Sequence, residues 1–260
     1  IYGQIVQMLE NREHWEDIGY LVQDGDFVEG SDMVIERPEE NSLPTISEAF
    51  PPNEIVQVAV YDSFEQEVDS VTESIRDDLE NGLRADDLLV ISVDDRHASS
   101  YLRTLSRKLA EMEIKSNNLH SDSFGIRDFR RRDQVTLSTV HKAKGNEAFM
   151  VYVVGVDALY SSRASVRERN MLFTAMTRAK GWARVSGIGQ WAQACKDEVD
   201  AALDNFPYLK FKYPSEQELK IMKRDLTEKG QRKLKAERML ERAMQEMTPD
   251  EIERFVNQRT

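Results

Sequence analysis

The segment Val135–Ala148, which reads VTLSTVHKAKGNEA, places polar and cationic residues directly after an apolar strand. The alternation of Val135, Leu137 and Thr139 predicts the strand, and His141–Glu147 follow it as a loop. Because ligands bind beyond the carboxyl ends of the strands in open parallel sheets, we expect this loop to lie at the functional edge of the sheet.

The residue types in this loop suit a nucleotide or a nucleic acid. Thr139 and His141 could bind the phosphates or sugars of a single strand, and Glu147 could accept hydrogen bonds from ribose hydroxyls. Gly145 would let the backbone approach such a ligand closely. On composition alone, a polar turn between two strands explains the same residues equally well.

A second segment, residues 167–185 (RERNMLFTAMTRAKGWARV), predicts a helix over about 166–180. At 100° per residue its polar side chains fall within roughly one quarter of the circumference. These polar residues are Arg167, Asn170, Thr174, Thr177 and Arg178. The apolar remainder predicts a widely buried helix, so the arginine charge needs a recipient. The residues alone favour an acidic side chain over a terminal phosphate, although a guanidinium also matches phosphate oxygens.

In this order and at this separation, the two segments resemble the last two sequence motifs of superfamily 1 DNA helicases of the UvrD/Rep type. The first stands as TVHKAKGNE, residues 139–147, against the family pattern T-x-H-x-x-K-G-x-E. The second stands as FTAMTRA, residues 173–179. The similarity extends over residues 85–187, is weaker over 55–84 and is absent from the tail.

The resemblance implies a role for each matching residue. Arg178 corresponds to a catalytic arginine finger, which contacts the γ-phosphate of ATP across a domain interface. Gly145 and Glu147 belong to the nucleotide-binding part, with Glu147 on the ribose. Thr139, His141 and Lys144 correspond to contacts with single-stranded DNA. An upstream RecA-like domain of the same longer chain would hold ATP with Mg²⁺, so we expect no metal ligand in the present chain.

The chain departs from the family pattern in several respects. Ala148 stands where the family usually has a large apolar or aromatic residue, and the gap between Leu119 and Val135 is too short for a large inserted subdomain. A phosphate loop of the form G-x-x-x-x-G-K-[ST] is also missing, because Gly25 and Gly30 have the spacing but no lysine follows. We therefore expect this chain to be inactive as an ATP hydrolase by itself.

Other chemistry-bearing residues have structural interpretations. Asp94-Asp95 could resemble a Mg²⁺-binding strand end, but a helix start or surface turn suits it better. The tract Arg130–Arg132 could track a nucleic-acid backbone, although a solvated loop explains it at least as well. Cys195 on a predicted helix is typical of a small packing residue. Three histidines lack metal-ligand spacing: His14, His97 and His120.

Composition and charge limit the function classes. The 260 residues are 40% hydrophobic and 32% charged, which is typical of a globular protein. The formal net charge is −12, yet residues 121–185 carry 12 Lys or Arg against 6 Asp or Glu, so the motif region can contact phosphates. The chain has no long apolar run, no signal peptide and one cysteine, so we expect a cytoplasmic protein without a membrane partner.

Strands that alternate with helices predict an α/β fold with a parallel sheet flanked by helices, followed by a helical C-terminal tail. The resemblance implies that this sheet is RecA-like. We expect strands at 55–61, 88–93, 135–140, 150–155 and 182–186, with Leu88–Val93 buried on both faces. We expect helices at 64–82 and around Leu102, Leu105 and Leu109.

Three parts of the chain are expected. Residues 1–54 form an N-terminal helical and irregular segment, since residues 22–54 are acidic and contain four prolines. Residues 55–213 form the second RecA-like helicase domain. Residues 214–260 form the tail, which opens with a capping-box pattern at Ser215 and Glu218 and has an apolar stripe that could bind a protein partner. Because the chain does not begin with Met, we expect it to be part of a longer protein.

The sequence therefore predicts the C-terminal motor domain of an ATP-dependent DNA helicase or translocase, which completes an ATP site and contacts single-stranded DNA. One alternative is a non-catalytic helicase-like scaffold that binds partners through its acidic first half and helical tail. A helicase-like motor that acts on RNA or is fused to a nuclease is a further alternative. Contact with a 2′-hydroxyl, which would distinguish RNA from DNA, cannot be deduced from these residues.

Overall fold

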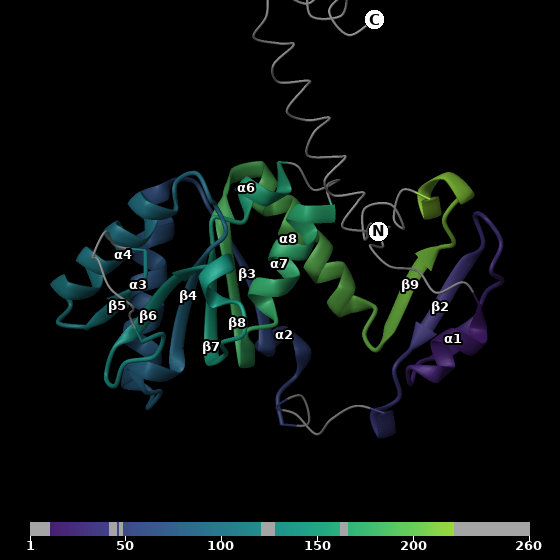
Figure 1. The fold of residues 1–260 in the computed structure, drawn as a ribbon, viewed down its shortest axis with the longest axis horizontal. Coiled ribbons are helices and arrows are strands. Elements are labelled where there is room, and N and C mark those ends of the chain that lie inside the picture. Colours follow the sequence, from purple (N-terminus) through teal and green to yellow (C-terminus); the bar gives the residue numbers. More distant parts are fainter. Residues whose placement is uncertain (1–10, 42–45, 47–48, 121–127, 162–165, 221–260) are drawn as a thin grey trace, which may run out of the picture.

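The computed structural model describes residues 11–41, 46, 49–120, 128–161 and 166–220. Its main feature is a six-stranded sheet in the order β3-β8-β7-β4-β6-β5, in which every neighbouring pair is parallel (Figure 1). The strands are β3 (Val56–Tyr61), β4 (Leu88–Ser92), β5 (Ser116–Asn118), β6 (Val135–Thr139), β7 (Ala148–Val154) and β8 (Ala179–Ile188). The prediction of a parallel α/β fold is confirmed.

Helices cover both faces of this sheet. On one face α3 (Phe64–Glu80) and α4 (Ala98–Glu111) pack through residues such as Ile75 and Leu105. On the other face lie α7 (Val166–Met176) and α8 (Gly189–Asp204), with the short helices α5 (Val140–Ala143) and α6 (Asp157–Tyr160). All five residues of β4 are buried, because its side chains alternate between the two hydrophobic clusters. The expected burial on both faces is confirmed.

Local signals explain where α3 begins and ends. The side chain of Ser63 accepts a hydrogen bond from the backbone N–H of Gln66, which satisfies one free donor of the first turn. Gly82, just past the helix, has φ +99°, a left-handed conformation that favours glycine. Ser63 therefore marks the start of the helix and Gly82 its end, where the sequence pattern predicts.

A second, smaller sheet lies beside the large one (Figure 1). It is antiparallel, in the order β1-β2-β9, with β1 (Leu21–Asp24), β2 (Asp32–Glu36) and β9 (Tyr208–Lys212). Together with α1 (Arg12–Asp17) it encloses its own hydrophobic cluster around Trp15, Met33 and Ile35. The interpretation of residues 22–54 as irregular is therefore wrong for this hairpin, because Met33 and Ile35 alternate inward and are held by a sequence-distant strand.

The remaining described elements are short: α2 (Pro52–Ile55) and the 3-10 turns Glu39–Asn41 and Ala85–Asp87. In the tail, Glu218 accepts hydrogen bonds from the backbone N–H and hydroxyl of Ser215, which confirms the capping box. The rest of the predicted helical tail lies outside the described residues. The three-part division of the chain stays a prediction, although Tyr208–Lys212 pair with β2 rather than with the large sheet. Among the described residues, none of the helices combines the length and apolarity needed to cross a bilayer.

Candidate functional site

Thr139 and His141 lie at the carboxyl end of the large sheet, as predicted. Thr139 is the last residue of β6 and pairs in register with Ser92, the last residue of β4. Thr139 is buried, whereas the side chain of His141 is 67% exposed. His141 belongs to the one-turn helix α5 rather than to a loop. The exposed imidazole of His141 is therefore accessible to a ligand at this end of the sheet.

Glu147 lies at the opposite end of the sheet, so its expected place beside His141 is wrong. Ala148 begins β7, and Met150 pairs in register with Leu88, the first residue of β4. The connection between two parallel strands has to return to the amino end before the second strand can begin. Residues 140–147 make this return, and they carry Glu147 away from the carboxyl end.

Lys144 and Gly145 lie along this return path and are both exposed. Gly145 has φ +86°, and a Cβ added there would meet nothing within 4 Å. Glycine is therefore required here by the backbone conformation rather than by close packing. The exposed surface around Gly145 leaves room for a ligand to approach its backbone.

Arg178 lies next to Glu147 at the amino end of the sheet. The backbone N–H of Ala148 donates to the carbonyl of Arg178 at 3.0 Å, and Ala148 pairs with Ala179 in the β7–β8 ladder. The carboxylate of Glu147 is 3.6 Å from the ammonium of Lys180. The two sequence motifs thus contribute an acid and two cations to one exposed region.

The Arg178 guanidinium folds back onto the end of α7. Its Nε donates to the carbonyl of Thr174 at 3.0 Å, and Nη2 donates to the hydroxyl of Thr177 at 3.3 Å. A cation at this position satisfies free carbonyls at the C-terminal end of a helix. Within the described part of the chain, Arg178 makes no ion pair with a carboxylate, so the acidic partner favoured by the residues alone is not found.

The predicted helix over 166–180 is shorter and more exposed than expected. It ends at Met176, and β8 begins at Ala179, so Arg178 occupies the turn between them. Phe173 is 67% exposed, so the prediction of wide burial is wrong; Met171 and Ala175 carry the main contact with the sheet. The error arises because the large side chain of Phe173 faces outward.

Other arginines have structural partners. Arg169 forms an ion pair with Glu198 of α8, and Tyr160 donates a hydrogen bond to the same carboxylate. Arg167, at the other end of α7 from Arg178, is 3.2 Å from Asp95. Sequence reasoning missed Glu198, because no local pattern links it to α7.

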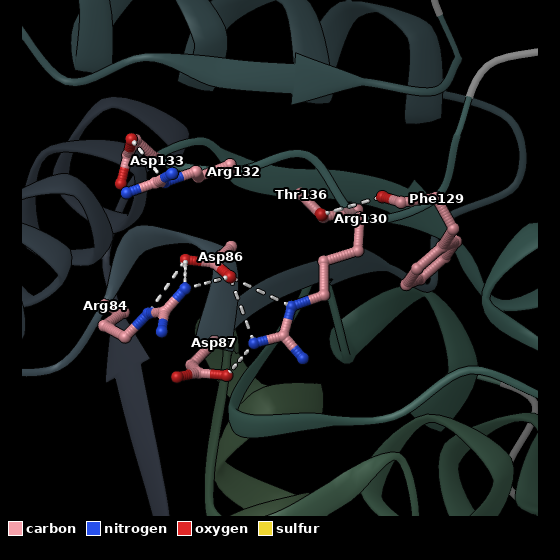
Figure 2. Close-up of polar contacts among 8 residues, drawn as sticks. All are labelled: Arg84, Asp86, Asp87, Phe129, Arg130, Arg132, Asp133 and Thr136. Atoms are coloured by element: carbon pink, nitrogen blue, oxygen red, sulfur yellow. Dashed lines mark hydrogen bonds and ion pairs between the residues drawn. The ribbon is translucent and has the colours of Figure 1, made fainter.

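The arginine tract before β6 is also tied to the protein. Figure 2 shows Asp86 between the guanidinium groups of Arg84 and Arg130. Burial would raise the pKa of Asp86, but the hydrogen bond from Arg84 and the two positive charges lower it below its usual value. Arg130 also pairs with Asp87, so it joins the turn before β4 to the segment before β6. These ion pairs give Arg130 a structural role.

Asp94 confirms the helix-start interpretation. Its carboxylate accepts hydrogen bonds from the backbone N–H groups of Arg96 and His97 just before α4. In the described part of the chain, no group of three His, Cys, Asp or Glu side chains is placed to hold a metal ion. Cys195 is buried in the core, and burial raises the pKa of its thiol to about 12, which fits a packing residue.

Glu67 is the chemically unusual residue that sequence reasoning missed. It is fully buried and accepts hydrogen bonds from the hydroxyls of Ser186 and Tyr101 and from the backbone N–H of Gly155. These partners come from β8, from α4 and from the end of β7. The sequence did carry a signal for its burial: Glu67 stands three residues after Phe64, so it falls on the apolar stripe of α3.

Comparisons with known proteins agree with the two motifs. A sequence model of the UvrD-like helicase C-terminal domain matches residues 134–186, which contain both segments. No curated protein matches the chain. A solved structure, the C-terminal domain of a possible DNA helicase from Lactobacillus plantarum WCFS1, matches with 19% identity and a TM-score of 0.39, over 55% of this chain and 78% of that chain. The similarity to helicases therefore rests on the sequence match over residues 134–186. Residues 134–186 are thus similar to the UvrD-like helicase C-terminal domain.

Proposed function

We propose that the chain is the C-terminal motor domain of an ATP-dependent DNA helicase or translocase and acts within a longer protein. The observation that carries the proposal is the pairing of β7 with β8, which brings Glu147 and Arg178 from separate motifs to one end of the sheet. A carboxylate that can accept from a ribose and a guanidinium that can hold a phosphate are thereby neighbours.

The amino end of the sheet would complete a nucleotide site. The described contacts of Arg178 use Nε and Nη2, so the Nη1 donors can still reach phosphate oxygens. Glu147 would have to release Lys180, but both side chains are about half exposed and such surface pairs are weak. The phosphate loop and the Mg²⁺ ligands would come from the upstream RecA-like domain, as the resemblance to the helicase family implies.

The carboxyl end of the sheet would contact single-stranded DNA through Thr139 and His141, with Lys144 along the return path. Helix α7 connects the two ends, since Arg167 near its start contacts Asp95 and Arg178 lies two residues beyond its last residue, Met176. Because this packed helix contacts both sites, nucleotide binding at one end could alter the affinity for DNA at the other.

The test uses the full-length natural protein in an assay of ATP hydrolysis stimulated by single-stranded DNA. His141→Ala should raise the DNA concentration for half-maximal stimulation, and Glu147→Gln should raise the KM for ATP, each with little change in kcat. Arg107→Gln, on the exposed face of α4, serves as the control with no expected effect. An active protein in which both site variants behave like the control would contradict the proposal.

The second candidate is a helicase-like scaffold without catalysis, favoured by the bonds that hold the Arg178 side chain against Thr174 and Thr177. A full-length protein that neither binds nor hydrolyses ATP would establish it. The present chain alone should show no ATP hydrolysis under either proposal.

A further inference from the structure

An exposed carboxylate lies between a guanidinium and an imidazole at the carboxyl end of the sheet. The Oδ2 atom of Asp95 is 3.2 Å from Nη2 of Arg167 and 3.7 Å from Nε2 of His141. The side chains are 38% exposed for Asp95, 58% for Arg167 and 67% for His141. One acidic oxygen therefore lies close to two nitrogen groups that come from different elements, α5 and α7.

Asp95 differs from its neighbour Asp94 in what it does for the fold. Asp94 is only 15% exposed and accepts backbone hydrogen bonds at the start of α4. The described contacts of Asp95 instead go to Arg167 and His141. Because exposed ion pairs add little stability, Asp95 is not needed to hold these elements together.

We propose that Asp95 occupies, in the free protein, the place of a backbone phosphate of single-stranded nucleic acid, and that Arg167 is a further contact to that phosphate. The inference rests on the proposed function of His141. A phosphate oxygen offers the same acceptor chemistry as the carboxylate, and the guanidinium of Arg167 matches it geometrically. The strand has to displace Asp95, so this carboxylate lowers the affinity while it keeps the side chains of Arg167 and His141 oriented.

The nearby charges are consistent with this exchange. When Asp95 is displaced, Arg167 keeps a contact to Glu168, whose oxygen is 3.4 Å away and whose side chain is largely buried. Arg167 therefore stays directed by its own helix while its outer nitrogen faces the strand. The arrangement makes binding depend on salt, because each phosphate contact releases counterions.

The experiment measures binding of a fluorescent oligo-dT, and in a parallel arm oligo-U, to the 260-residue chain at several salt concentrations. Asp95→Asn should tighten binding about two- to fivefold, because it removes the competing charge. Arg167→Gln should weaken binding by a similar factor and reduce the slope of log affinity against log salt by about 0.7. Arg167→Lys should retain most of the affinity. Equal effects in both arms would assign the contact to the phosphate backbone shared by DNA and RNA.

The matched controls are Arg107→Gln and Glu111→Gln, an exposed ion pair of the same charge types on α4. Circular dichroism and thermal unfolding check that every variant is folded. If His141→Ala weakens binding but the Asp95 and Arg167 variants behave like the controls, the inference is wrong and the proposed function stands. If wild type does not bind either oligonucleotide, or His141→Ala has no effect, the proposed DNA contact itself fails.

Discussion

Replacement of Glu67 by alanine should destabilise the protein strongly, although Glu67 belongs to neither motif. Its carboxylate joins three buried donors: the hydroxyls of Ser186 and Tyr101 and the backbone N–H of Gly155. Alanine would leave these donors without their acceptor and would open a cavity between α3 and the end of the sheet.

The structure sets the size of the effect. A buried backbone N–H left unpaired costs about 1–3 kcal/mol, and each lost hydroxyl bond costs about 0.5–1.5 kcal/mol, less where the hydroxyl finds another acceptor. We expect Glu67→Ala to lower the free energy of unfolding by about 3 kcal/mol. For a protein of this size that corresponds to a fall in Tm of about 6–12 °C.

Urea and thermal unfolding, followed by circular dichroism, measure this loss. Glu65→Ala is the matched control, because it makes the same chemical change at an exposed position of the same helix. The control should change the free energy of unfolding by less than about 0.5 kcal/mol. Equal stability of the Glu67 and Glu65 variants would refute the reasoning that the buried acceptor is required.

The same residue predicts a pH dependence. Burial raises the pKa of Glu67 above its ordinary 4.5, and the charge of Asp157 adds to the rise, while hydrogen bonds from Ser186, Tyr101 and Gly155 oppose it. The folded protein therefore holds this proton more tightly than the unfolded chain. The stability that Glu67 contributes is complete below pH 4.5 and is lost as the pH rises through its folded pKa. The difference in unfolding free energy between wild type and Glu67→Gln should fall over that range; a difference that rises with pH would contradict the assignment.

Three further changes test the fold and the site. Arg130→Gln should leave oligonucleotide binding unchanged and cost about 0.5–1 kcal/mol of stability, because Arg130 pairs with Asp86; weaker binding measured with oligo-dT would show that it contacts nucleic acid. Cys195 should resist a thiol reagent in the folded protein and react in urea, since it is buried and its pKa is about 12; fast labelling detected by mass spectrometry under native conditions would contradict this. Leu105→Ala should cost about 2–5 kcal/mol in urea unfolding, whereas Leu209→Ala, 46% exposed, should cost far less; similar losses would place the core elsewhere.

The sequence predicted the large sheet well, because its signals are local. Leu88–Ser92 is a continuous apolar run, and such runs form central parallel strands. The stripe of Leu102, Leu105 and Leu109 likewise identified α4 and its buried face. The small sheet was missed because its third strand, residues 208–212, is distant in sequence from the other two. No local pattern reveals that this strand pairs with β2.

The candidate site was predicted residue by residue but not in its geometry. The motifs identified Thr139 and His141 at the carboxyl end of the sheet. Placing Glu147 there was wrong, because the segment that connects two parallel strands has to return to the amino end of the sheet before β7 begins. The contact between Asp95 and Arg167 depends on how α7 packs, so it could not be predicted from either motif.

The central claim is that Arg178 acts on the nucleotide held by the upstream domain. The most direct measurement is the kcat of ATP hydrolysis stimulated by single-stranded DNA in the full-length natural protein, wild type against Arg178→Ala. On the precedent of arginine fingers, we expect a loss of about a thousandfold or more, with unchanged stability and oligonucleotide affinity. A variant that is folded and retains the kcat of wild type would contradict the claim.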